Sequence, residues 1–390
     1  MYIYPNLYKK FECIGSACKN SCCCAGWDIT LDPDTTDYYQ HLDTDFGAYL
    51  RKNIYEENDM TLIRLTSDGR CPFLDEDGLC QVYRNCGPEH MSTTCQGFPR
   101  RRFTKGKNAM RGLSLSCEAV LHLLQNDSEP IQICVEGTTD LNNINDVSVY
   151  EIAQFIAWGT ELLQDSSVPL GIALGTVLYI GMEVAPYFKN QDYPQIEHLI
   201  LQSESIQKEF ELVKESIGKD ELANSAWQFI LQVTDTFYAT FQQISFPHAK
   251  TLLWQKEIAT LSDSDRKEYI RNSYLEHRTR RNEEQHLLFM RRLASLLFCG
   301  HSLGIEIEES EQIFLQDICN FMLLAEILPA TCAAGKTADP DRYHPRLVDL
   351  SRLFEQTHLI ANYVWPIIKK LFSPDTLTYT LAFMVLFDEL

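Results

Sequence analysis

The chain has 390 residues, a formal net charge of −20 and fourteen cysteines. It is long enough to bury a sizeable core without disulfide support. So strong a negative charge argues against nucleic acid as a partner, because phosphate backbones are bound by basic surfaces.

The first residues, MYIYPNLYKKFEC, lack the charged and then apolar pattern of a secretion signal. We therefore expect a cytoplasmic protein whose thiols stay reduced. The longest uncharged stretch, 168–182, is shorter than the roughly 20 residues that a membrane helix needs. We expect it to be a buried helix, and we expect no membrane partner.

Along the first third of the chain the predicted elements are short. Residues 61–66 alternate like a strand, and 35–55 contain a helix. The segment CPFLDEDGLCQVY predicts two strands joined by a turn that ends at Asp77-Gly78, with Cys71 and Cys80 facing each other. A polar segment rich in turn formers, 126–146, then predicts a boundary between a domain at 1–135 and a domain at 146–390.

Beyond this boundary the apolar residues recur with a helical period. The predicted helices lie at 147–164, 170–186, 195–217, 220–244, 250–261, 264–280, 283–300, 308–328, 346–372 and 376–387. The expected fold is therefore mainly α: a small cysteine-rich α+β metal-binding module at the N-terminus, followed by a larger all-α helical domain.

Cysteines are concentrated in two groups within the first 120 residues. The first group holds Cys13, Cys18, Cys22, Cys23 and Cys24, and the second holds Cys71, Cys80, Cys86, Cys95 and Cys117. In a reducing compartment, such density indicates metal binding or catalysis before disulfides. On an extended chain, Cys22 and Cys24 could face one site while Cys23 faces elsewhere. The two groups must converge in space to form one centre.

Tetrahedral zinc and a [4Fe–4S] cluster both accept four cysteine ligands. The paired C-x2-C spacing of structural zinc sites is missing, which favours iron and sulfide. The radical-SAM spacing C-x3-C-x2-C is begun by Cys18 and Cys22 but has Ala25 at its third position. The centre could take part in chemistry, or it could only stabilise the fold of the module.

Four segments resemble the flagellin lysine N-methylase family, within the wider group of zinc- or iron-chelating domains with a CxxCxxCC-type pattern. They are CIGSAC…CCCAGWDI, CPFLDEDGLCQVY, CQGFPR and SLSLSCEA, in the same order and with matching spacing over about residues 11–125. The family usually has two cysteines before Gly-Trp, so either Cys22–Cys23 or Cys23–Cys24 is the matching pair. Cys86 is an addition to the pattern.

The resemblance implies a protein-lysine N-methyltransferase that acts on flagellin, with S-adenosylmethionine as the methyl donor and an iron–sulfur cluster. The alternative is a non-catalytic zinc- or iron-binding adaptor, and a third possibility is a redox carrier. On this resemblance, the metal ligands are expected among Cys13, Cys18, Cys22, Cys23, Cys71, Cys80, Cys95 and Cys117.

The sequence assigns neither the catalytic nor the cofactor-binding residues. No G-x-G loop between a strand and a helix is visible, so a Rossmann methyltransferase is not supported. Aromatic candidates near the cysteines are Trp27, Tyr38, Tyr39 and Tyr83. Two basic segments, 100–111 and 278–292, could hold a cofactor carboxylate or an acidic stretch of a partner, or could simply be solvated.

Overall fold

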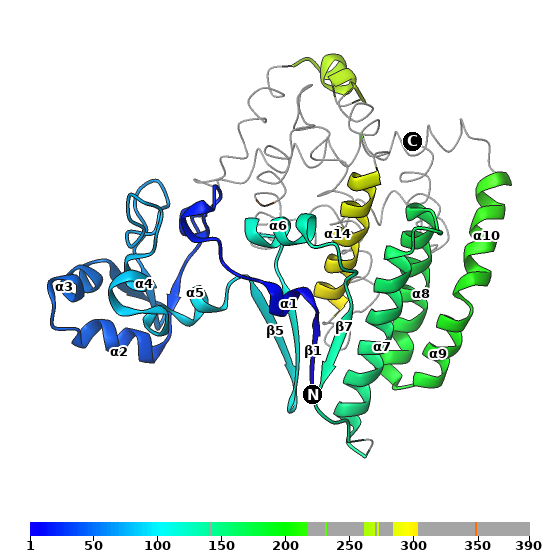
Figure 1. The fold of residues 1–390 in the computed structure, drawn as a ribbon, viewed down its shortest axis with the longest axis horizontal. Coiled ribbons are helices and arrows are strands. Elements are labelled where there is room, and N and C mark those ends of the chain that lie inside the picture. Colours follow the sequence, from blue (N-terminus) through cyan, green and yellow to red (C-terminus); the bar gives the residue numbers. More distant parts are fainter. Residues whose placement is uncertain are drawn as a thin grey trace.

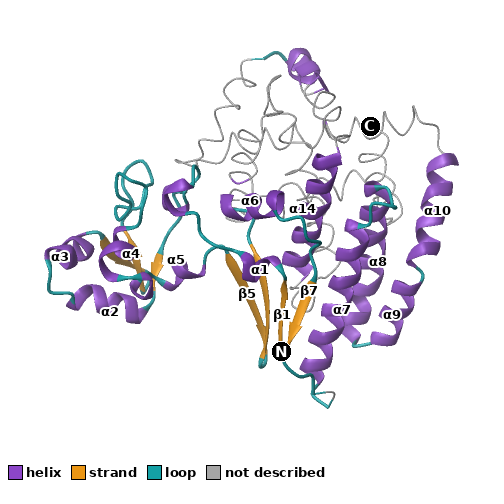
Figure 2. Ribbon diagram, in the orientation of Figure 1, coloured by secondary structure: helices purple, strands orange, loops and turns teal. Residues whose placement is uncertain are grey.

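The computed structural model describes residues 1–140, 142–216, 231, 261–269, 271–272, 284–302 and 348. The described part is mainly helical, with two small sheets in the N-terminal part (Figure 2). This agrees with the prediction of a mainly α protein whose N-terminal region is α+β. The predicted helices at 220–244, 250–261, 308–328, 346–372 and 376–387 lie outside the described residues, apart from single positions.

The first strand joins distant parts of the chain into a four-stranded sheet. Strand β1 (Tyr2–Pro5) lies between β6 (Asn108–Leu113), to which it is parallel, and β7 (Ile133–Glu136), to which it is antiparallel. Strand β5 (Arg100–Lys105) pairs antiparallel with β6 and stands at the end of the order β5-β6-β1-β7. Helices α1 (Leu7–Lys10) and α6 (Glu118–Asn126) accompany the sheet.

Helices pack beside this sheet and share one hydrophobic core with it (Figure 1). Helix α7 (Ile144–Gln164) contacts α8 (Leu170–Asn190) and α14 (Glu284–Ser302), and α9 (Tyr193–Leu201) and α10 (Ser203–Ser216) follow α8. The periodicity therefore located α7, α8 and α14 correctly. The helix predicted at 195–217 is two helices, because the chain turns at Gln202.

Helix α8 is an apolar helix of the core. Its stretch Leu170–Phe188 is long and apolar enough to cross a membrane, but 71% of its most apolar window is buried inside the protein. Burial against α7, α9 and α10 accounts for this composition. The expectation of a buried helix over 168–182 is confirmed.

Two arginines of α14 are buried at the ends of other helices. The guanidinium of Arg291 donates to the carbonyl oxygen of Leu163, and that of Arg292 donates to Leu124 O and Glu129 O. The last carbonyl groups of a helix have no partner within that helix, and a cation there also complements the helix dipole. These two arginines of the basic segment 278–292 are therefore neither solvated nor available to a cofactor.

Residues 22–98 form a separate lobe, here called the thiol module, which lies at the left of Figure 1. It contains β2 (Thr30–Leu31), α2 (Pro33–His41), α3 (Asp45–Lys52), β3 (Ile54–Glu57), β4 (Met60–Ile63), α4 (Gln81–Cys86) and α5 (Thr93–Gly97), with the short 3₁₀ helices η2 (Cys22–Cys24) and η3 (Pro88–His90). Its sheet has the order β2-β4-β3.

The thiol module has its own hydrophobic core, built around Tyr39, Leu50 and Phe73. The core of the rest of the protein instead joins residues before position 135, such as Ile3 and Leu121, to residues of α7 and α8. Residues 22–98 therefore have one hydrophobic core, and the described residues before and after them share the other. The domain boundary at 135–146 stays a prediction.

Candidate metal centre

A short 3₁₀ helix orients the three consecutive cysteines. The Ser21 hydroxyl accepts a hydrogen bond from the Cys23 amide at 3.2 Å and begins η2. A 3₁₀ helix has three residues per turn, so the three side chains diverge by about 120°. Cys23 packs against the core of the thiol module. The expectation of an extended chain, with Cys22 and Cys24 facing one site and Cys23 elsewhere, is therefore wrong.

The segment from Cys71 to Cys86 is a tight antiparallel turn followed by a helix: the predicted turn at Asp77-Gly78 is confirmed, but the two predicted strands are wrong. Only one bridge forms, between Leu74 and Cys80. The Asp75 carboxylate accepts from Leu79 N, and Gly78 adopts a φ of 77° that closes the turn. Residues 81–86 then form α4 and bury Val82 in the core, because tertiary packing favours a helix over a second strand.

Cys95 is placed by a helix cap. Ser92 is buried at the start of α5, and its hydroxyl accepts a hydrogen bond from the Cys95 amide at 3.1 Å. Asp32, which caps α2, also accepts from the Thr93 amide at 2.9 Å. Helix α5 is thereby fixed beside α2, with its cysteine packed against the module core.

Together these turns and caps gather four thiols, called here the thiol group: Cys23, Cys71, Cys80 and Cys95. Burial raises the pKa of Cys71, and interactions with the other three thiols raise it further. Burial likewise raises the pKa of Cys80, and it raises the pKa of Cys95 to about 11, with Cys23 contributing in both cases. Thiols that affect one another in this way lie within electrostatic reach of each other.

Backbone amides already donate hydrogen bonds to two of the sulfurs. The Phe73 amide lowers the pKa of Cys71, and the Tyr83 and Val82 amides lower the pKa of Cys80, in each case against the larger effect of burial. Such bonds stabilise a thiolate, and hydrogen bonds to the sulfurs also tune iron–sulfur clusters. Four neighbouring thiols at the edge of a core, two of them with amides directed at the sulfur, fit a cysteine-ligated metal or cluster.

A single metal ion and a cluster require different spacings of their ligands. In tetrahedral zinc sites the sulfurs lie about 2.3 Å from the ion, and thus about 3.8 Å from one another. Within the described residues, no three Cys, His, Asp or Glu side chains form a group that could hold one metal ion.

Of the other predicted ligands, Cys22 adjoins Cys23 in η2, whereas Cys13, Cys18 and Cys117 lie outside the thiol module. The Cys18 thiol donates to Glu118 Oε2 at 3.4 Å, and burial, Glu118 and Cys117 raise the pKa of Cys18 to about 12. Cys117 packs against the main core at the start of α6. Cys13 is exposed on the segment before the 3₁₀ helix η1 (Gly15–Ala17). The two groups of cysteines thus converge crosswise: Cys23 meets Cys71, Cys80 and Cys95, whereas Cys18 meets Cys117.

Some of the aromatic candidates are packed inside the thiol module, and others lie at its surface. Tyr39 is buried beside the thiol group, where burial and the nearby thiols raise its pKa. Trp27 packs on Phe98, with ring centroids 4.9 Å apart. Tyr38 stacks on His90 at 3.6 Å, and Tyr83 is 58% exposed. Tyr39 is therefore the aromatic candidate whose side chain is buried beside the thiol group.

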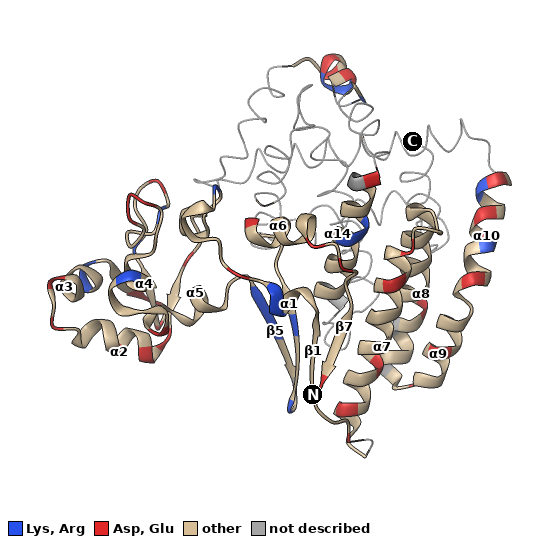
Figure 3. Cartoon of the chain, in the orientation of Figure 1, with Lys and Arg blue, Asp and Glu red and all other residues tan. Residues whose placement is uncertain are grey.

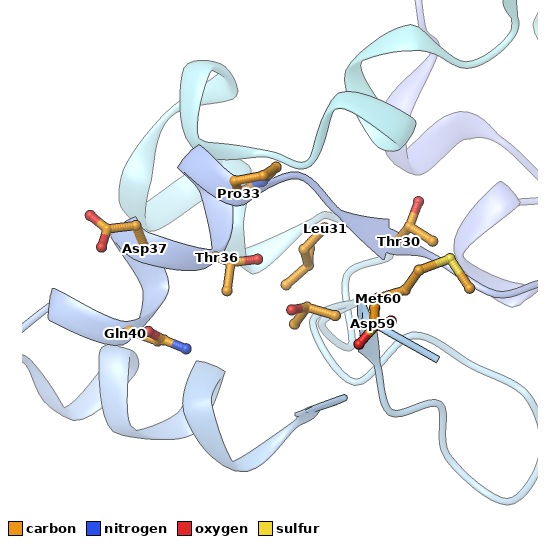
Figure 4. Close-up of a pocket in the computed structure, with 9 residues that line it drawn as sticks. Thr30, Leu31, Pro33, Thr36, Asp37, Gln40, Asp59 and Met60 are labelled. Carbon is orange, nitrogen blue, oxygen red and sulfur yellow. The ribbon is translucent and has the colours of Figure 1, made fainter. Parts of the chain in front are cut away.

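A pocket of about 530 Å³ lies beside α2, between it, β2 and the β3–β4 turn. Figure 4 shows Thr36 and Gln40 of α2 on one side of it and Met60 of β4 on the other. Sequence reasoning missed this pocket, because its walls meet only after α2 packs beside the β3–β4 turn. Its lining residues are Thr30, Leu31, Pro33, Thr36, Asp37, Gln40, Asp59, Met60 and Thr61.

Comparison with known proteins finds relatives that are named as lysine-N-methylases or as a flagellar biosynthetic protein. The chain is 36% identical over 135 residues to the flagellar biosynthetic protein FliU of Salmonella muenchen, covering 33% of this chain and 79% of that protein. The chain belongs to the flagellin lysine N-methylase family. It is also 34% identical over 137 residues to the lysine-N-methylases of Salmonella typhimurium and Salmonella choleraesuis.

Coverage of these family members is uneven. The matches take in 33% of this chain, and they span about a third of the length of the two lysine-N-methylases. No protein-family model matches the chain, and no solved structure matches it.

Proposed function

We propose that this protein is a cytoplasmic methyltransferase that transfers methyl groups from S-adenosylmethionine to lysine side chains of flagellin. The names of the relatives support this activity: two are lysine-N-methylases, and FliU is a flagellar biosynthetic protein. A reducing cytoplasm would keep the fourteen cysteines as thiols.

The proposal includes a [4Fe–4S] cluster held by Cys23, Cys71, Cys80 and Cys95. The single observation that carries it is the gathering of these four thiols, one buried and three half-buried, from three separate segments, with backbone amides directed at Cys71 and Cys80. When bound, the cluster would supply iron for electron exchange or ligand binding, and its thiolate bonds would fasten these segments together.

Transfer of the methyl group forms a bond from the lysine nitrogen to carbon as the carbon–sulfur bond of the sulfonium breaks. The sulfur leaves as a thioether, and the nitrogen loses a proton to a base. The pocket beside α2 is our candidate for the lysine. Asp37 and Asp59 in its lining would attract the ammonium group, and the Thr36 hydroxyl is buried there without a hydrogen-bond partner among the described residues.

Metal analysis tests the cluster. Protein purified without oxygen is assayed for iron, acid-labile sulfide and zinc, and its absorbance spectrum is recorded. We expect iron and sulfide at about four each per chain. One zinc per chain without sulfide would refute the cluster and leave a closed zinc site.

Methyl transfer is tested separately, with the metal-loaded protein, flagellin and S-adenosylmethionine labelled in its methyl group. Label on flagellin lysines is the expected result, and a flagellin with its lysines already dimethylated is the control. If the metal centre is intact and no label reaches lysine, the non-catalytic adaptor is the better description. Reversible reduction of the cluster without transfer would indicate a redox carrier.

A further inference from the structure

One face of the four-stranded sheet carries a positive charge that contrasts with the net charge of −20. Between Glu89 and Glu118 the chain has no acidic residue, and its basic residues there are Arg100, Arg101, Arg102, Lys105, Lys107 and Arg111. Figure 3 shows Lys and Arg positions along β5 and on the neighbouring α1. These residues give an acidic protein a local basic surface.

Strand register places three of these arginines on one side of the sheet. Arg102 is directly opposite Arg111, and Arg100 follows the same side of β5 two residues away. The opposite side faces the core, since Phe103 is paired with Met110 and both pack there. Like charges directly opposite each other destabilise a sheet. A bound anion would remove that repulsion.

Aromatic rings hold two of the arginines in place. Arg111 lies 4.6 Å from the ring centroid of Tyr2 and 5.7 Å from that of Tyr8. Arg100 lies 5.7 Å from Tyr8 and 4.9 Å from Phe11, and it donates a hydrogen bond to the carbonyl oxygen of Phe11 at 3.1 Å. Guanidinium groups stacked on rings keep their edges available for carboxylates, with less side-chain entropy to lose on binding.

Local carboxylates do not neutralise this arginine face, defined as Arg100, Arg102, Arg111, Tyr2, Tyr8 and Phe11. Glu136 is near enough to Arg111 for the pKa of its carboxyl to be lowered, first by Lys9 and Tyr4 and also by Arg111, but its hydrogen bonds are with Lys9 and Tyr4. Within the described part of the chain, no carboxylate forms an ion pair with Arg102, which is exposed.

The face borders an edge strand. β5 ends the sheet, and no described strand pairs with its outer edge. An extended peptide can add to such an edge through main-chain hydrogen bonds, while alternate side chains contact one face. Arg100 and Arg102 are about 7 Å apart at two residues of strand rise, which matches carboxylates at alternate positions of that peptide.

We propose that the arginine face and the edge of β5 bind an extended acidic segment of a partner protein, with Asp or Glu at every second residue. Bidentate pairs between these carboxylates and the arginines supply specificity, and the edge of β5 sets the register. This interaction is independent of methyl transfer and goes beyond it.

Fluorescence anisotropy with the full-length protein tests the proposal. The probe is a labelled peptide with alternating Glu and Thr, compared with the peptide in which Gln replaces Glu. We expect saturable binding of the Glu peptide only, weakening as salt rises. Failure to bind the Glu peptide, or equal binding of both peptides, would overturn the proposal.

Charge reversal locates the site. Arg102→Glu should weaken binding by about tenfold or more, and Arg102→Gln by about half that effect on a logarithmic scale. The matched control is Lys107→Glu, an equal charge change at the exposed β5–β6 turn, for which we expect less than about threefold. Thermal unfolding of each variant checks that the fold is kept.

Two outcomes would replace this proposal. Equal weakening in Arg102→Glu and Lys107→Glu would mean diffuse attraction without a site. Tighter binding of an oligothymidylate of the same length, in competition with the peptide, would mean that the face prefers a nucleic-acid backbone.

Discussion

The backbone amide of Cys71 donates a hydrogen bond to the carbonyl oxygen of Cys23 at 2.7 Å. This bond fastens the turn at Cys71 to η2, although the two residues are far apart in sequence. Burial of Cys71 and the packing of Cys23 on the same core bring their thiols together. The bond thus joins the two cysteine groups of the sequence at the thiol group.

Serine substitutions test which of the consecutive cysteines is a ligand. Cys23→Ser should lower bound iron and sulfide by more than about half, because it removes one of four thiolates. Cys24→Ser, the matched neighbour in η2, should retain them. Iron and sulfide content of both variants, purified anaerobically, is the measurement. Loss of iron from Cys24→Ser, with retention in Cys23→Ser, would show that the thiol group is wrongly assigned.

Alkylation rates should follow burial of the thiols. In the metal-free protein at pH 8, iodoacetamide should modify exposed Cys13 well before Cys71 and Cys95. Only a thiolate is nucleophilic, and burial raises the pKa of Cys95 to about 11. Labelling of Cys95 should therefore accelerate as pH approaches 11. Mass spectrometry of timed samples measures this order, and in guanidinium chloride the rates should converge.

The Asp32 cap should stabilise the module in a pH-dependent way. Burial alone would raise the pKa of the Asp32 carboxyl, but hydrogen bonds from Thr93 and Thr35 outweigh it and lower the pKa to about 2. A depressed pKa in the folded state means that the stabilisation is present above the unfolded value of about 4. It is lost as pH falls from there through about 2.

Asn keeps one acceptor oxygen for the α2 cap but replaces the oxygen that accepts from the Thr93 amide, so Asp32→Asn should lower the free energy of unfolding by about 1 kcal/mol at pH 7. The difference in free energy of unfolding between this variant and the wild type should shrink as the pH falls from 4 to 2. Asp34→Asn, at an exposed residue in the first turn of α2, is the control and should have a small effect. Urea unfolding at several pH values measures both. A constant difference across this range would contradict the assignment.

Helices α7 and α14 approach closely at Gly159. A Cβ atom there would lie 2.3 Å from the Phe298 ring, and this ring also packs on Phe155. Gly159→Ala should destabilise the protein by about 1–3 kcal/mol through overpacking. Gly97→Ala in α5 is the matched control: among the described residues nothing lies within 4 Å of its Cβ position, so stability should stay or rise slightly. Equal melting temperatures for the two variants would argue against this packing.

Local sequence pattern determined the long helices. The apolar period that located α7 and α14 reflects one buried face of each helix, a property that each segment carries in its own residues. The cysteine motifs likewise indicated, by resemblance, the family that the relatives support, whereas the metal centre stays a prediction. The break at Gln202 and the helix α4 were not predicted, because packing against other segments decides them.

Only the tertiary structure decided which cysteines meet. Spacing along the chain cannot tell that Cys23 meets Cys95 while Cys18 meets Cys117, because these contacts depend on the path of the chain between them. The same holds for Arg102 opposite Arg111, a matter of strand register, and for Arg291, whose burial follows from the position of the α7 C-terminus. The sequence determined the kinds of chemistry present, and long-range packing determined which side chains share a site.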